Sequence, residues 1–71
     1  MDILIFETNV DTLKDEKKVK ALFNGTTGIK SWSIDRQDED KILRIEASET
    51  SPKLIEGLLR NAGYHCLQLY Y

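Results

Sequence analysis

The stretch from Ser51 to Tyr64, SPKLIEGLLRNAGY, decides the fold because it specifies one amphipathic helix together with both of its ends. Ser51 can cap the first turn, and Pro52 fits the first helical position, where its missing N–H costs nothing. Gly63 can take the left-handed conformation that ends a helix. Between these ends the apolar residues recur at helical spacing and form one broad face: Leu54, Ile55, Leu58, Leu59 and Ala62. A helix with such a face must bury it against other elements.

Strand patterns lie on both sides of this helix. The segment YHCLQLYY (64–71) follows it and indicates a final strand. Before it, IKSWSID (29–35) and KILRIEA (41–47) both alternate apolar with polar residues, which is typical of half-buried strands. Only the polar turn DRQDED (35–40) joins these two segments, so we expect them to form a hairpin.

The N-terminal part of the chain adds a strand and a second helix. DILIFE (2–7) is rich in β-branched and aromatic residues. It is apolar on both faces, which is typical of a central strand or of a strand whose outer face meets a partner. From Asp11 to about Asn24 the pattern is helical, although only its second half is clearly amphipathic. The glycines of NGTTG (24–28) can end this helix.

In chain order the segments predict an α+β fold with the order βαββαβ. Each βαβ half can form a right-handed crossover, which places both helices on one face of a four-stranded antiparallel sheet. This is the ferredoxin-like fold, and it leaves the other face of the sheet open. The predicted core comprises twelve apolar residues: Val19, Leu22, Phe23, Trp32, Ile34, Leu43, Ile45, Leu54, Ile55, Leu58, Leu67 and Leu69.

Length and composition restrict what the chain can do. Its 71 residues predict a single domain (1–71), and 31% charged with 41% hydrophobic residues is typical of a soluble globular chain. The net charge of −2 gives no basic footprint for nucleic acid. The longest apolar run, Ile3–Phe6, is too short for membrane insertion and lacks the flanks of a signal peptide. One cysteine indicates a reducing, cytoplasmic setting. Paired carboxylates in a pocket and a Gly-rich phosphate loop are both missing, so we expect neither an enzyme nor a cofactor.

The chain resembles the heavy-metal-associated (HMA) domains, the family of small copper chaperones and of the N-terminal modules of metal-pumping ATPases. The resemblance covers nearly all of the residues and rests on three stretches. These are TNV (8–10) before the first helix, GIKSWSID (28–35), where the family typically has a Gly-Val pair before its second strand, and LIEGLLRNAGY (54–64). The last is the most telling, since the family's second helix commonly ends in Ala-Gly-Tyr or Ala-Gly-Phe. The resemblance implies the βαββαβ fold and a relation to heavy-metal transport.

The family binds soft metals through a Cys-x-x-Cys motif after the first strand, and Thr12 and Asp15 stand at the corresponding positions here. A threonine hydroxyl is a poor ligand, and a lone carboxylate prefers hard cations. Thr12 and Asp15 instead fit a helix capping box, in which each side chain binds the backbone N–H of the other residue. Two alternatives stay open: a hard-metal site built from Asp11, Asp15 and Glu16, and a partner-binding surface at this loop.

Cys66 and His65 are weaker candidates for metal ligands. They are adjacent on the predicted last strand, so their side chains should point to opposite faces and should not share one ion. We expect Cys66 to be a small apolar residue of the sheet and His65 to lie at the surface or at the edge of the core. In many copper-chaperone-like proteins a residue from the loop after the second helix approaches the metal, and Tyr64 lies near that place.

The open sheet face indicates association, because contiguous exposed apolar residues mark binding surfaces. We expect Leu4, Phe6 and Ile42 to be the interaction residues. The first functional hypothesis is therefore a degenerate, non-enzymatic member of the family that acts as an interaction module, either with a protein partner or as a homodimer. The second is a metal-binding protein with non-standard ligands, such as one Cys66 from each subunit of a dimer.

Overall fold

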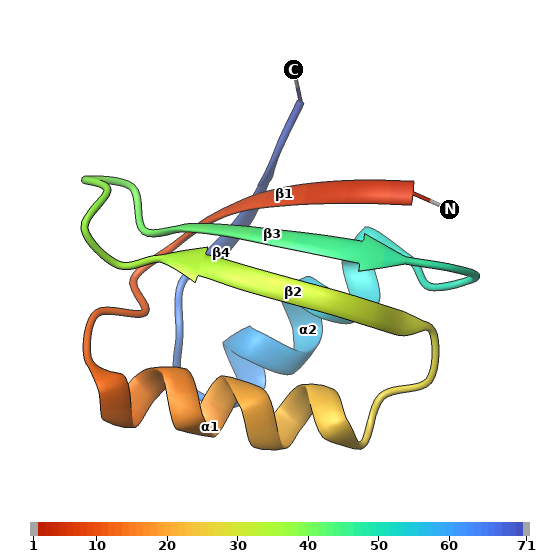
Figure 1. Cartoon of the computed structure of the whole chain (residues 1–71), viewed down its shortest axis with the longest axis horizontal. Coiled ribbons are helices and arrows are strands. Elements are labelled where there is room, and N and C mark those ends of the chain that lie inside the picture. Colours follow the sequence, from red (N-terminus) through yellow and green to blue (C-terminus); the bar gives the residue numbers. More distant parts are fainter. Residues whose placement is uncertain (1, 71) are drawn as a thin grey trace.

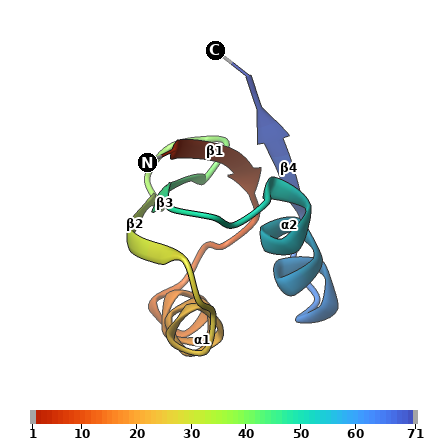
Figure 2. The ribbon, with the colours of Figure 1, turned by 90° about the vertical axis from the view of Figure 1, so that its right-hand side faces the viewer.

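The computed structural model of the protein describes residues 2–70 and contains all six predicted elements (Figure 1). Met1 and Tyr71, which belong to the predicted domain, and Tyr71 also to the last predicted strand, lie outside the described residues. They are β1 (Asp2–Thr8), α1 (Leu13–Asn24), β2 (Ile29–Asp35), β3 (Ile42–Ala47), α2 (Pro52–Asn61) and β4 (Cys66–Leu69). The strands form one antiparallel sheet in the order β2-β3-β1-β4. Seen along the sheet, α1 lies beneath β2 and β3, whereas α2 lies next to β4 (Figure 2). The ferredoxin-like fold is therefore confirmed.

The central strand β1 answers a question that the sequence leaves open, namely which of its faces is buried. Leu4 and Phe6 face the helices and are 8% and 0% exposed. Ile3, 46% exposed, and the half-buried Ile5 face the open side of the sheet. The expectation that Leu4 and Phe6 are interaction residues is therefore wrong, because both belong to the core.

The core lies between the sheet and the two helices. Its largest fully buried side chains come from both layers and from the connection between β1 and α1: Phe6, Val10, Val19, Leu43, Ile45, Ile55, Leu59 and Cys66. Leu54 and Leu67 are exposed. Half of the other predicted core residues are buried, namely Val19, Phe23, Leu43, Ile45 and Ile55. The other half are partly buried: Leu22, Trp32, Ile34, Leu58 and Leu69.

Two predicted core residues are exposed. Leu54 is 47% exposed, because the buried stripe of α2 is narrow and runs through Ile55 and Leu59. Leu67 is 46% exposed, since the register of β4 against β1 turns Cys66 inward and its neighbour outward. Neighbouring side chains of a strand point to opposite faces of the sheet. The observed register therefore places every side chain of β4 on the face opposite to the predicted one.

Two glycines shape the turns that hold the fold together. Gly28 has φ of 99°, and a Cβ at this position would lie 2.6 Å from the backbone oxygen of Ser48, so only glycine fits without a shift. Gly63 has φ of 95° just after α2, and the following N–H, that of Tyr64, donates to the carbonyl of Leu59 at 2.9 Å. The predicted helix end at Gly63 is confirmed, and it directs the chain back toward the sheet.

The outer edge of β4 is covered by two side chains of α2. The backbone N–H of Gln68 donates to Glu56 Oε2 at 2.9 Å, and Arg60 Nη2 donates to the carbonyl of Cys66 at 2.9 Å. Glu56 and Arg60 are also paired with each other at 3.8 Å. Together they satisfy backbone groups that an added strand would otherwise bind, which protects this edge of the sheet from strand pairing.

Candidate functional site

The loop Asn9–Thr12 connects β1 to α1, at the place where the resemblance puts the metal-binding loop. Thr12 is the N-cap of α1, and its Oγ1 accepts a hydrogen bond from the backbone N–H of Asp15 at 3.1 Å. In return, the backbone N–H of Thr12 donates to Asp15 Oδ2 at 3.3 Å. The predicted capping box is confirmed. The two side chains that the resemblance assigns to the ligand positions thus bind each other's backbone.

Tyr64, which follows α2, contacts the capping box through Asp15. Its Oη donates to Asp15 Oδ1 at 2.9 Å, so both carboxylate oxygens accept hydrogen bonds. The bond from Tyr64, and then the bonds from Thr12, hold the pKa of Asp15 below its ordinary value. Desolvation, and then the bond to Asp15, raises the pKa of the Tyr64 hydroxyl above its ordinary value. The folded protein therefore favours an ionised Asp15 beside a neutral Tyr64.

This pair predicts how stability depends on pH at both extremes. The stabilisation from Asp15 is present above its unfolded pKa of 3.8 and is lost as the pH falls through the lowered folded value. The stabilisation from Tyr64 is present below its unfolded pKa of 10.0 and is lost as the pH rises through the raised folded value. Replacing Tyr64 by phenylalanine should raise the pKa of Asp15, since the largest cause of its depression is removed.

An NMR titration of the side-chain carboxyl carbon of Asp15 measures this effect directly. Tyr70→Phe is the matched control, because Tyr70 is 84% exposed and lies outside the site. We expect the Asp15 titration to move upward in Tyr64→Phe and to stay in place in Tyr70→Phe. An Asp15 titration that is the same in all three proteins would show that the Tyr64–Asp15 hydrogen bond does not form in solution.

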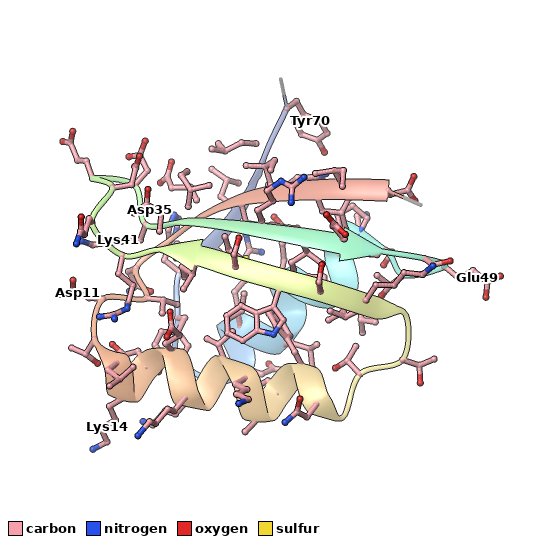
Figure 3. The ribbon with its side chains drawn as sticks, in the orientation of Figure 1. Asp11, Lys14, Asp35, Lys41, Glu49 and Tyr70 are labelled. Carbon is pink, nitrogen blue, oxygen red and sulfur yellow. The ribbon has the colours of Figure 1, made fainter. Side chains whose placement is uncertain are left out.

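The turn between β2 and β3 packs against the same loop (Figure 3). Lys41 Nζ lies 3.3 Å from Asp11 Oδ1 and donates to the carbonyl of Arg36 at 2.6 Å. Arg36 in turn pairs with Glu16, with 3.5 Å between Nε and Oε1. The carbonyl of Lys41 accepts from Thr8 Oγ1 at 2.6 Å, which ties the end of β1 to this turn. The β2–β3 turn thus holds the loop through Asp11, and Tyr64 holds the first turn of α1 through Asp15.

The three carboxylates proposed as a hard-metal site do not converge on one point. Asp11 pairs with Lys41, Glu16 pairs with Arg36, and Asp15 binds Thr12 and Tyr64. Within residues 2–70, no group of three or more His, Cys, Asp or Glu side chains is placed to hold a metal ion. Asp11, Asp15 and Glu16 therefore act as partners of neighbouring protein groups.

Cys66 and His65 lie on opposite faces of the sheet. His65 is exposed on the open side, where its Nε2 lies 3.1 Å from Glu7 Oε1, and its backbone N–H donates to Asn9 Oδ1 at 2.8 Å. Cys66 is fully buried on the helix side. Burial, and then the charge of Glu56, raises the pKa of its thiol to about 12. The thiolate that a soft metal requires is strongly disfavoured at this position.

The burial of Cys66 predicts slow chemistry at its thiol. A thiol with a pKa of about 12 is almost entirely protonated at neutral pH, and a fully buried side chain is closed to reagents. We expect labelling by a disulfide reagent at pH 8 to follow the opening of the fold and to become immediate in guanidinium chloride. Equal labelling rates in buffer and in denaturant would contradict the buried position.

The open face of the sheet carries the apolar side chains of the strands that point away from the helices. Ile5 lies opposite Leu69 in the β1–β4 pairing, and the exposed Ile3 and Leu67 flank them. Ile42, from β3, also points to this face and is half-buried. Of the three predicted interaction residues, only Ile42 lies on the open side, where Ile3, Ile5 and Leu67 also lie.

Sequence reasoning placed Tyr64 near the site but did not predict its bond to Asp15, and it did not find Lys41 or Arg36. The signal for Tyr64 is its position directly after the glycine that ends α2. No comparable signal exists for Lys41 and Arg36, because their contacts with the loop depend on how the β2–β3 turn folds back beside β1.

Comparison with solved structures confirms the fold suggested by the resemblance. One chain, from a structure described as "Crosstalk between Cu(I) and Zn(II) homeostasis", is 15% identical, with a TM-score of 0.82 over 97% of this chain and 100% of that one. The N-terminal domain of ZntA in its Zn(II) form is 16% identical, with a TM-score of 0.79 over 93% of this chain and 89% of that one. No family model and no curated protein matches the sequence. The chain therefore shares its fold with these two structures at low sequence identity.

Proposed function

We propose that this chain is a non-enzymatic interaction module that has the fold of heavy-metal transport and chaperone domains but lacks their thiolate site. One observation carries the proposal. Thr12 and Asp15, at the positions that the resemblance assigns to the metal-binding cysteines, form a closed capping box that Tyr64 completes. Every polar atom that these two side chains offer is engaged within the protein.

The chemistry of the site supports this proposal. Soft ions such as Cu(I) select thiolate and thioether ligands, and neither stands at the loop. A hard cation would have to compete with Lys41 for Asp11, with Arg36 for Glu16 and with Tyr64 for Asp15. It would also need several further oxygen ligands.

The position of Cys66 weighs against the alternative in which one Cys66 from each of two subunits binds one metal. The side chain is fully buried beneath the sheet, and its carbonyl is held by Arg60. Cys66 would have to leave the core to reach a second subunit, which would open the contact between β4 and α2.

Calorimetric titration with Zn(II) tests the proposal. We expect no saturable binding beyond the weak heat that exposed carboxylates give, and no shift of the Thr12 and Asp15 amide resonances. One-to-one binding of Zn(II) that moves these resonances would overturn the proposal. Sedimentation analysis at increasing concentration separates a homodimer from a monomer that binds a different protein.

The setting of the module follows from the same features. None of the helices within residues 2–70 has the length and apolar character needed to cross a membrane. We place the module in the cytoplasm because its lone cysteine is a free thiol. The open face of its sheet carries exposed apolar side chains, which suit it to bind another protein.

A further inference from the structure

A groove of about 610 Å³ runs between α1 and β2. Leu13, Lys17 and Lys20 line it from the helix, and Trp32 and Ile34 line it from the strand. The helix residues recur at i, i+4 and i+7, so they form one stripe along the side of α1 that faces β2. Figure 1 shows α1 running beneath β2 over most of the length of the strand.

The groove combines an apolar floor with a defined shape. Leu13 is 53% exposed, and Trp32 and Ile34 are half-buried. The indole of Trp32 is held edge-on against Phe23, with 5.3 Å between the ring centroids and 81° between the planes. The edge-on contact gives the ring a defined orientation, and its partly exposed surface can pack against another side chain.

The charge of the groove is positive although the chain as a whole is acidic. Within residues 2–70, neither Lys17 nor Lys20 is in an ion pair, and both are exposed. The one acid in the lining, Glu16, is neutralised by Arg36 at 3.5 Å. The groove therefore offers two unpaired cations to an acidic ligand.

The two edges of the sheet differ in how they are protected. Glu56 and Arg60 cover the edge of β4, as described above. On the opposite edge, β2 pairs only with β3 among the described strands, and its register shifts between Ile29 and Ser31. After that shift the segment Ser31–Asp35 pairs regularly with β3, and its outer side borders the groove. A regular, uncovered edge of this kind can accept an added strand.

We propose that an extended, acidic segment of a partner protein docks in this groove as a fifth strand beside β2. The proposal deepens the interaction function proposed above and rests on it. The groove is lined by α1 from Leu13 to Asn24, a length of about 16 Å at 1.5 Å per residue. An extended strand covers this length with about five residues. The side chains of the docked strand that point toward α1 place an apolar group over Trp32 and carboxylates beside Lys17 and Lys20.

Selection from a display library of random linear peptides tests the proposal with the folded protein as bait. We expect the enriched peptides to be rich in Asp and Glu interspersed with apolar residues. Lys17→Glu with Lys20→Glu should weaken their binding about tenfold or more, since two attractions become repulsions. Lys14→Glu with Lys18→Glu is the matched control, because it makes the same change in charge on the same exposed helix, outside the groove.

The outcomes separate this proposal from the one on which it rests. If both double substitutions weakened peptide binding equally, net charge would explain the effect, and the proposed docking in the groove would be contradicted. The absence of acidic binders would also contradict it, as would binders whose amide shifts map to the open sheet face around Ile5 and Leu69. In that last case the interaction function would stand without the groove. Tight binding of Zn(II) at Thr12 and Asp15 would instead contradict the interaction module itself.

Discussion

Replacing Leu59 by alanine is expected to lower the free energy of unfolding by about 2 to 5 kcal/mol. Leu59 is fully buried where α2 meets the sheet, so its loss removes apolar contact and leaves a cavity. At typical stabilities per residue, a chain of 71 residues has about 4 to 11 kcal/mol in total. The substitution therefore removes a large part of the stability and should lower Tm by about 10 °C or more.

The neighbouring leucines of α2 provide the controls for this experiment. Leu54→Ala removes the same atoms from a side chain that is 47% exposed, and we expect it to cost less than about 1 kcal/mol. Leu58 is half-buried, so Leu58→Ala should fall between the two. Denaturant unfolding curves give all three values. If Leu54→Ala and Leu59→Ala were equally destabilising, the assignment of the buried face of α2 would be mistaken.

The double substitution Thr12→Cys with Asp15→Cys should create tight binding of a soft metal, which we do not expect of the wild type. It places two thiols at i and i+3 at the start of α1, in the loop where the resemblance puts the metal motif. The positive end of the helix lowers thiol pKa values, so both groups become thiolates readily. Loss of the capping box should cost about 1 kcal/mol, and the bond from Tyr64 is lost as well.

The matched control is Thr12→Ser with Asp15→Ser, which has nearly the same shape as the cysteine variant without its sulfur. Both variants lose the carboxylate of Asp15, so any difference in metal binding belongs to the thiols. We expect Cu(I) to remain with the cysteine variant in the presence of a competing chelator and to leave the serine variant. A folded cysteine variant that retains no Cu(I) would show that this loop is not aligned with the family's motif.

The sequence was most informative where local chemistry decides the structure. The N-caps Thr12 and Ser51, the capping box and the helix end at Gly63 depend on residues within a few positions of one another, and all were predicted. The order of strands and helices followed from apolar periodicity, which is also a local property. The fold was therefore predictable, although two solved structures with this fold are only 15% and 16% identical to the chain.

Prediction failed where the answer depends on long-range register. Nothing local shows whether Leu67 or Cys66 faces the helices, because both are apolar and the choice is set by how β4 pairs with β1. The same applies to β1, whose two faces are both apolar, so that Leu4 and Phe6 were assigned to the wrong side. The contacts of Tyr64 with Asp15 and of Lys41 with Asp11 also join residues far apart in the sequence.

The most direct test of the central claim is a titration of the wild-type protein with Cu(I) under reducing conditions and in competition with a chelator. The claim is that Thr12, Asp15 and Tyr64 form a closed hydrogen-bonded site in place of a soft-metal site. We predict that the chelator keeps all of the Cu(I) and that the amide resonances of Thr12 and Asp15 do not move. Retention of one Cu(I) per protein molecule by the wild type would contradict the claim.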